Sequence, residues 1–119
     1  MTQNTVPTVQ EPQVRRTDHR FEIHADDSGQ PPGFTLYRDY TTDGGSVQRI
    51  FPHTEVKDEF EGHGLASTLV REALDLSVAE GVAIVPVCPY VKSWIEKHDG
   101  YAEHVVQTTP DHLQFLSGR

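Results

Sequence analysis

The chain is poor in cysteine, in long apolar runs and in basic residues, and each shortage excludes a class of protein. The single cysteine, Cys88, has no partner for an internal disulfide, so the cytoplasm is the default location. No run approaches the ~20 apolar residues that span a bilayer, and residues 1–18 lack the apolar centre of a signal peptide. We therefore expect no membrane association. The formal net charge of -8 argues against a nucleic-acid partner, which needs a basic face.

A metal centre is also not expected. The seven histidines are dispersed, and neither an H-E-x-x-H motif nor a Cys-His ligand spacing is present. The length of 119 residues fits one compact core. We expect a disordered polar tail over residues 1–18, one domain over residues 19–106, and a frayed tail over residues 107–119.

The first half of the domain alternates apolar and polar residues, as half-buried strands do. The alternation predicts strands over 21–25, 34–40 and 47–56. A glycine-containing hairpin turn at 42–45 joins the second strand to the third. Pro52 should interrupt one ladder bond or mark a bulge in the third strand. Together these segments predict an antiparallel meander.

The second half changes to the helical period. Residues 63–80 carry a wide apolar stripe that includes Leu76, and Gly81 ends this helix. The apolar run that starts at Val82 predicts a buried strand, and the strand-helix-strand order implies a right-handed crossover and a parallel pair. A helix over 89–98 and a short helical turn over 101–106 follow. The fold class is α+β (mixed α/β): an antiparallel meander, then a helix, a parallel strand and a C-terminal helix.

The most informative segment joins the two halves and reads Glu59-Phe60-Glu61-Gly62-His63-Gly64-Leu65-Ala66. Its two glycines allow backbone N–H groups to crowd around a phosphate, and the helix that begins near His63 adds the positive end of its dipole. This pattern predicts an anion cradle. The alternative is that Gly62 and Gly64 form only the turn by which the chain enters the helix.

The flanking segments give this cradle a family context. His53-Thr54-Glu55-Val56 precedes it and Pro86-Val87-Cys88-Pro89-Tyr90-Val91 follows it. In this order the segments resemble the GNAT superfamily of acetyl-CoA-dependent N-acetyltransferases, more narrowly its small single-domain branch with G-x-G-[IL]-A and P-x-C motifs. The resemblance covers residues 20–106. One departure is Glu59, where the superfamily usually has Gln or Arg, so we expect Glu59 to point away from the ligand or to contribute only its backbone.

The resemblance implies a GNAT-like fold, acetyl-CoA as co-substrate and an amine as acceptor. The strand over 82–87 should then run parallel to the strand that contains His53 to Val56, with a splay between them for pantetheine. Protein lysines, polyamines and small metabolite amines all stay possible acceptors, and the acidic surface favours a cationic one. Monomer and homodimer are both open. The residues implied for cofactor binding are Val56, Glu61, Gly62, His63, Gly64, Leu65, Ala66, Cys88 and Tyr90.

Cys88 follows an apolar strand and precedes Pro89, which places its thiol at the start of the predicted helix. The helix dipole there favours the thiolate. In the resembling branch this position lies near the cofactor sulfur. Cys88 could accept the acetyl group, protonate the leaving thiolate, or line the pocket. The alternative is a small buried side chain kept for packing.

His53 and Glu55 are candidates for the base. They share one face of their strand by the two-residue alternation, and either could accept the ammonium proton, directly or through water. A solvent-facing pair is the alternative. Tyr90 and Tyr101 are candidates for protonating the thiolate, with packing as the alternative for both.

Two function classes follow from these features. The first is an amine N-acetyltransferase. The second is an acetyl-CoA-binding module with little or no turnover that serves regulation or protein interaction. Glu59 and the small size of the chain keep the second class open, and measured turnover with a panel of amines separates the two.

Overall fold

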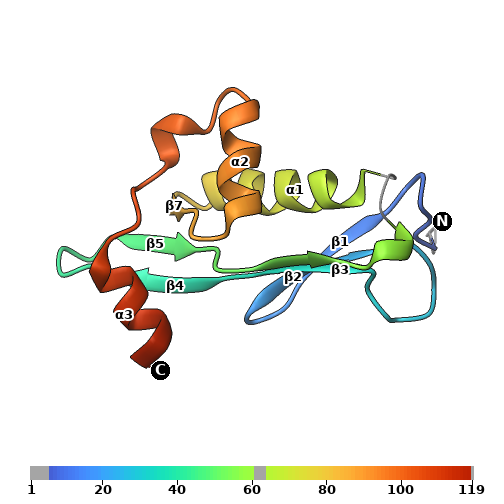
Figure 1. Ribbon diagram of the computed structural model, residues 1–119, viewed down its shortest axis with the longest axis horizontal. Helices are drawn as coiled ribbons and strands as arrows, with labels where there is room; N and C mark the ends of the chain where they lie inside the picture. Colours follow the sequence, from blue (N-terminus) through green and yellow to red (C-terminus); the bar gives the residue numbers. More distant parts are fainter. Residues whose placement is uncertain (1–5, 61–63, 119) are drawn as a thin grey trace.

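The computed structural model describes residues 6–60 and 64–118. Strands precede helices along most of the chain, as the sequence predicts (Figure 1). In chain order the elements are β1 (Gln13–Arg16), β2 (Arg20–His24), β3 (Gly33–Leu36), β4 (Arg38–Thr41), β5 (Val47–Ile50), β6 (Thr54–Val56), the 3-10 turn η1 (Asp58–Phe60), α1 (Leu65–Ala79), β7 (Ala83–Val85), α2 (Pro89–Lys97), the 3-10 turn η2 (Ala102–His104) and α3 (Pro110–Gly118).

The strands form two hydrogen-bonded groups, ordered β1-β2-β3-β6 and β4-β5-β7. Each of β1–β2, β2–β3, β3–β6 and β4–β5 is antiparallel, which confirms the predicted meander. Two predicted strands are each split. The second breaks at Tyr37 into β3 and β4, and the third breaks after Ile50 into β5 and β6.

The break in the third strand is a bulge at Phe51 and Pro52. Before the bulge Ile50 pairs with Arg38, and after it Thr54 pairs with Thr35. The strand that contains the bulge thus advances by one residue more than its partner, and the register shifts by one. The extra residue lies on the strand that contains Pro52, which has no N–H for the ladder. The prediction that Pro52 disturbs this strand is confirmed.

β7 forms a parallel pair through the α1 crossover, as predicted, but the strand beside it is not the one expected. β7 runs parallel to β5, with Gln48 opposite Ala83 and Ile50 opposite Val85. We expected β7 to lie beside His53 to Val56, and that expectation is wrong because the bulge separates β6 from β5. The N–H of Cys88 still donates to the carbonyl of Phe51 at 2.8 Å. Beyond that bond β6 pairs with β3 and the other chain segment enters α2, so the two strands diverge.

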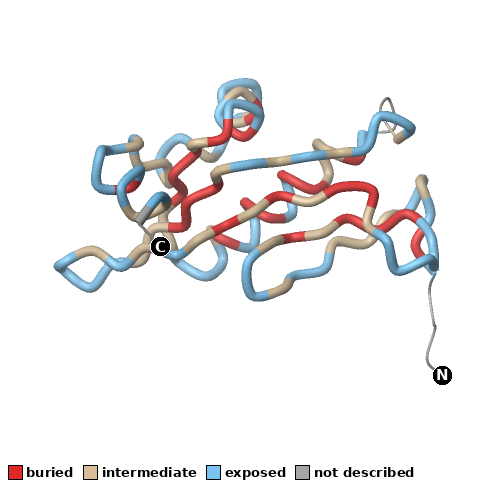
Figure 2. The backbone as a smooth tube through the Cα atoms, turned by 60° about the horizontal axis from the view of Figure 1, so that its bottom comes forward, coloured by how far each residue is buried: buried red, intermediate tan, exposed pale blue. Residues whose placement is uncertain are grey.

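Both α1 and α2 lie on one side of the strands, and α3 lies on the other side beside β4 (Figure 1). Long buried stretches of the chain alternate with exposed stretches that lie mainly at the loops and the outer edges of the molecule (Figure 2). Leu76, predicted on the apolar stripe of α1, is 39% exposed, and Ser77 is buried in its place. The main hydrophobic core consists of Phe21, Ile23, Ala25, Tyr37, Phe51, Leu65, Leu69, Val70, Ala73, Leu74, Ile84, Cys88, Val91 and Trp94.

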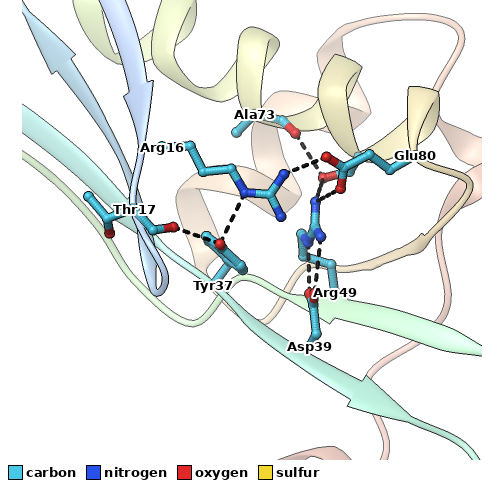
Figure 3. Close-up of polar contacts among 8 residues, drawn as sticks. Arg16, Thr17, Tyr37, Asp39, Arg49, Ala73 and Glu80 are labelled. Atoms are coloured by element: carbon cyan, nitrogen blue, oxygen red, sulfur yellow. Dashed lines mark hydrogen bonds and ion pairs between the residues drawn. The ribbon is translucent and has the colours of Figure 1, made fainter.

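The hydroxyl of Ser77 accepts a hydrogen bond from Arg49 at 3.3 Å, and Arg49 carries a charge that sequence analysis did not place in the interior. The Arg49 side chain is 2% exposed, forms two hydrogen bonds with Asp39 at 2.7 and 3.0 Å, and pairs with Glu80 at 2.9 Å (Figure 3). Arg16 also pairs with Glu80 and donates to the hydroxyl of Tyr37. This network ties β1, β4 and β5 to the residue that follows α1.

The structure differs from the predicted tails at both ends. Residues 13–16, assigned to the N-terminal tail, form β1 and pair with β2. Residues 110–118, assigned to the C-terminal tail, form α3. His112 of α3 is 2% exposed and contacts the Gln48 side chain at 2.6 Å. Short polar segments gave no periodic signal; pairing with β2 orders β1, and contacts with β4 and Gln48 order α3.

Candidate functional site

A groove of about 420 Å³ opens where β6 and β7 diverge. One wall is β6 with η1, and the opposite wall is formed by the first turns of α1 and α2. The lining residues are Thr54, Val56, Phe60, Gly64, Leu65, Ala66, Ser67 and Tyr90. Five of these, Val56, Gly64, Leu65, Ala66 and Tyr90, are residues that the sequence assigned to cofactor binding.

Gly64 caps α1 at the outer part of this groove. Its φ of 74° is left-handed, a conformation that side-chain-bearing residues rarely adopt, and among the described residues no atom lies within 4 Å of the position that a Cβ would take. The first backbone N–H groups of a helix have no acceptor inside the helix. The first turn of α1 therefore presents N–H groups without an acceptor inside the helix and a positive dipole end, with no acidic side chain in that turn.

Part of the predicted cradle lies outside the described residues: Glu61, Gly62 and His63. Their assignment to cofactor binding stays a prediction. Glu59, which precedes them in η1, is exposed, and so is Lys57. The structure therefore describes only the α1 end of the predicted cradle.

Thr54 lies at the inner end of the groove, in front of Cys88. The thiol of Cys88 donates to the Thr54 hydroxyl at 3.5 Å, and the hydroxyls of Thr54 and Thr35 are 2.8 Å apart. Cys88 directly precedes Pro89, the first residue of α2, as the sequence predicts. It is only 4% exposed and is not among the lining residues, so Thr54 separates the thiol from the groove.

His53 and Glu55 form a pair, with His53 Nε2 3.1 Å from Glu55 Oε1. Their side chains are 55% and 64% exposed. The alternation along β6 places them on the face opposite to Thr54 and Val56. A proton transfer from a substrate in the groove to this pair therefore has to pass around the edge of β6, and a water molecule is the natural carrier.

The two tyrosine candidates differ in their position. Tyr90 lines the groove from the first turn of α2, and partial burial raises its pKa. Tyr101 packs against Trp94, and its hydroxyl donates to Asp75 at 2.5 Å. Burial and that hydrogen bond raise the pKa of Tyr101 to about 12. The structure does not bring Tyr101 to the groove, so we assign it the packing role.

Sequence analysis missed Thr54, Phe60 and Ser67 as lining residues. Thr54 had a usable signal, since it lies two residues from Val56 and alternation puts both on one face. Ser67 also accepts a hydrogen bond from the indole N–H of Trp94 at 2.9 Å, which links the groove to the core of α2. No pattern in the sequence indicated that link.

Comparison with known proteins decides the family. Residues 20–105 match the family described as GCN5-related N-acetyl-transferase. The chain belongs to this family. In this GCN5-related domain, the groove lies between β6 and the first turns of α1 and α2.

Similar proteins agree with this assignment. Protein NATD1 of Gallus gallus is 34% identical over 55 residues, which cover 44% of this chain and 50% of that protein. The match thus spans about half the length of the curated relative. A solved GCN5-like protein from Staphylococcus aureus has a TM-score of 0.60 at 21% identity, covering 84% of this chain and 93% of that one. At that identity the likeness shows the shared fold.

A second solved structure has the same fold. The ribosomal-protein-alanine N-acetyltransferase from Brucella melitensis biovar Abortus 2308 gives a TM-score of 0.53 at 17% identity, covering 79% of this chain and 71% of that one.

Two further observations concern residues 6–60 and 64–118. They contain no helix with the length and apolar character of a membrane span, and no group of three potential metal ligands.

Proposed function

We propose that this GCN5-related domain transfers an acetyl group from acetyl-CoA to a primary amine. The observation that carries the proposal is the groove, which extends from the first turn of α1 to Thr54, with Cys88 behind Thr54. A pyrophosphate suits the α1 end, because helix N-termini bind anions. The apolar side chains of Val56, Phe60 and Leu65 suit the extended pantetheine arm.

The chemistry is direct attack of the amine on the thioester carbonyl. The first turn of α1 holds the phosphates, and the groove walls orient the thioester for attack. Glu55 or His53 accepts the ammonium proton through water, because both are solvent-exposed beside the edge strand. Thr54 and Cys88 lie at the end of the groove that suits the leaving thiolate.

The acceptor belongs to the cationic amines in this proposal. The formal charge of -8 disfavours anionic acceptors at long range and favours lysine side chains, polyamines or small amines. We place the reaction in the cytoplasm on the ground that one cysteine cannot form an internal disulfide. A monomer and a homodimer both agree with the groove, which one copy of the chain lines by itself.

A specific observation keeps a second function open. Glu59 lies in η1 next to Phe60, which lines the groove, and a carboxylate near this wall disfavours an anionic ligand by repulsion. A lowered affinity for acetyl-CoA would reduce turnover. The domain would then act mainly as a binding module that serves regulation or contacts a protein. Turnover separates this module from the transferase, whereas binding alone does not.

The test is release of CoA thiol in the presence of a panel of amines, with the acetylated product identified by mass spectrometry. The panel includes a lysine peptide, a polyamine and small metabolite amines. Amine-dependent CoA release with a matching product supports the transferase. Saturable acetyl-CoA binding without product supports the binding module. Absence of binding at millimolar acetyl-CoA refutes both.

A further inference from the structure

We propose that the hydroxyl of Thr54 contacts the thioester sulfur, and that the thiol of Cys88 supplies a proton to the leaving thiolate through this hydroxyl. The inference rests on the proposed acetyl transfer and assigns a catalytic residue to the same groove. Thr54 lines the groove, whereas Cys88 is 4% exposed behind it. Any proton that leaves the thiol for the groove therefore passes Thr54 first.

The hydrogen bonds of Thr54 allow its proton to point into the groove. A threonine hydroxyl has one proton and accepts two hydrogen bonds. Cys88 donates its S–H to Thr54 Oγ1 at 3.5 Å. Either hydroxyl can be the donor in the 2.8 Å contact between Thr35 and Thr54, and the relay uses the arrangement in which Thr35 donates to Thr54 and not to the carbonyl of His53 at 3.4 Å.

Two donors thus occupy the acceptor positions of Thr54. Thr35 and Cys88 are both buried, so neither donor is replaced by bulk water. The proton of Thr54 is left for an acceptor in the groove. An acceptor seated at this end, such as a sulfur that gains negative charge, then receives a hydrogen bond that is oriented before the reaction.

The proton balance requires Cys88 as well as Thr54. When the C–S bond of the tetrahedral intermediate breaks, its electron pair goes to the CoA sulfur. Thr54 gives its proton to that sulfur and takes the proton of the Cys88 thiol in the same event. Cys88 becomes a thiolate; water carries the proton that the acetylated amine loses to Thr54, which takes it up and returns its own proton to Cys88. The net result is one amine proton transferred to CoA.

Both ends of this transfer have a physical justification. An aliphatic hydroxyl is a far weaker acid than a thiol, so Thr54 alone cannot neutralise the leaving group. With Cys88 the proton passes from one thiol group to another. The Cys88 thiolate forms directly before the nine-residue helix α2, whose N-terminus stabilises negative charge.

The kinetic test compares Thr54→Val with Thr54→Ser. Valine keeps the shape and removes the hydroxyl, so we expect kcat to fall by about a hundredfold while KM for acetyl-CoA stays within about threefold. Serine keeps the hydroxyl and should restore most of kcat. Thr41→Val, at an exposed position in β4, is the matched control and should leave kcat unchanged. Full activity in Thr54→Val, or a Thr54→Ser variant as slow as Thr54→Val, overturns the proposal.

A second measurement is independent of turnover. The S–H stretch of Cys88, the single cysteine, lies in an infrared window without other protein bands and moves to lower frequency when the thiol donates a hydrogen bond. We expect this band to shift upward in Thr54→Val and to stay in place in Thr54→Ser and Thr41→Val. An unshifted band in Thr54→Val overturns the relay even if no amine is acetylated. A shifted band without any turnover supports the hydrogen-bond chain and refutes only the proposed transferase.

Discussion

Gly64→Val tests whether the first turn of α1 binds the cofactor. The left-handed φ of 74° makes any side chain at this position costly, by roughly 1–2 kcal/mol. The space that a Cβ would enter borders the groove, and no atom of residues 6–60 and 64–118 lies within 4 Å of it. The added side chain therefore strains the backbone and also fills volume that the phosphates need.

Gly81→Val is the matched control, because it separates strain from ligand exclusion. Gly81 has a φ of 77°, likewise has no atom of the described chain within 4 Å of an added Cβ, and follows the other end of α1. It does not line the groove. Both variants should lose a similar roughly 1–2 kcal/mol of stability without ligand. Only Gly64→Val should lose the stabilisation that acetyl-CoA provides.

The size of that stabilisation follows from mass action. At one hundred times its dissociation constant, a ligand that binds only the folded state adds about 2.7 kcal/mol. For a domain of this length, that raises the melting temperature by about 10 °C. The assay is thermal unfolding with and without acetyl-CoA, followed by the fluorescence of Trp94, the single tryptophan. A full shift in Gly64→Val, or an equal loss in Gly81→Val, refutes the cradle.

Three further predictions concern other residues. Hydrogen bonds from Arg16, the larger effect, and from Arg49 hold the pKa of Glu80 below the usual 4.5. Glu80 therefore stabilises the fold above about pH 4.5, and this stabilisation is lost as the pH falls. In an acid titration, the free energy of unfolding of Glu80→Gln should fall less steeply than that of the wild type. Tyr101→Phe should cost about 0.5–1.5 kcal/mol in denaturant unfolding, with kcat unchanged; a large fall in kcat would contradict its packing role. Cys88→Ala should lower turnover with acetyl-CoA affinity within about threefold, and retained activity in Cys88→Ser would speak against a covalent acetyl carrier.

Local patterns in the sequence determined most of the elements, β1 and α3 excepted, and five of the eight lining residues of the groove. Alternation gave the antiparallel meander, the helical period gave α1, and Pro89 marked the start of α2. Val56, Gly64 and Tyr90 could be assigned because the motifs that contain them are short and contiguous. These are properties of neighbouring residues, so the chain alone specifies them.

Tertiary structure decided which segments meet. Because of the bulge after Ile50, β7 pairs with β5 and not with β6, the expected partner. The groove lies where β6 and β7 diverge. Only the fold places Thr54 between Cys88 and the groove. It also places Tyr101 beside Asp75, away from the groove. Such contacts join residues more than twenty positions apart, so they depend on strand register and packing, which no local pattern encodes.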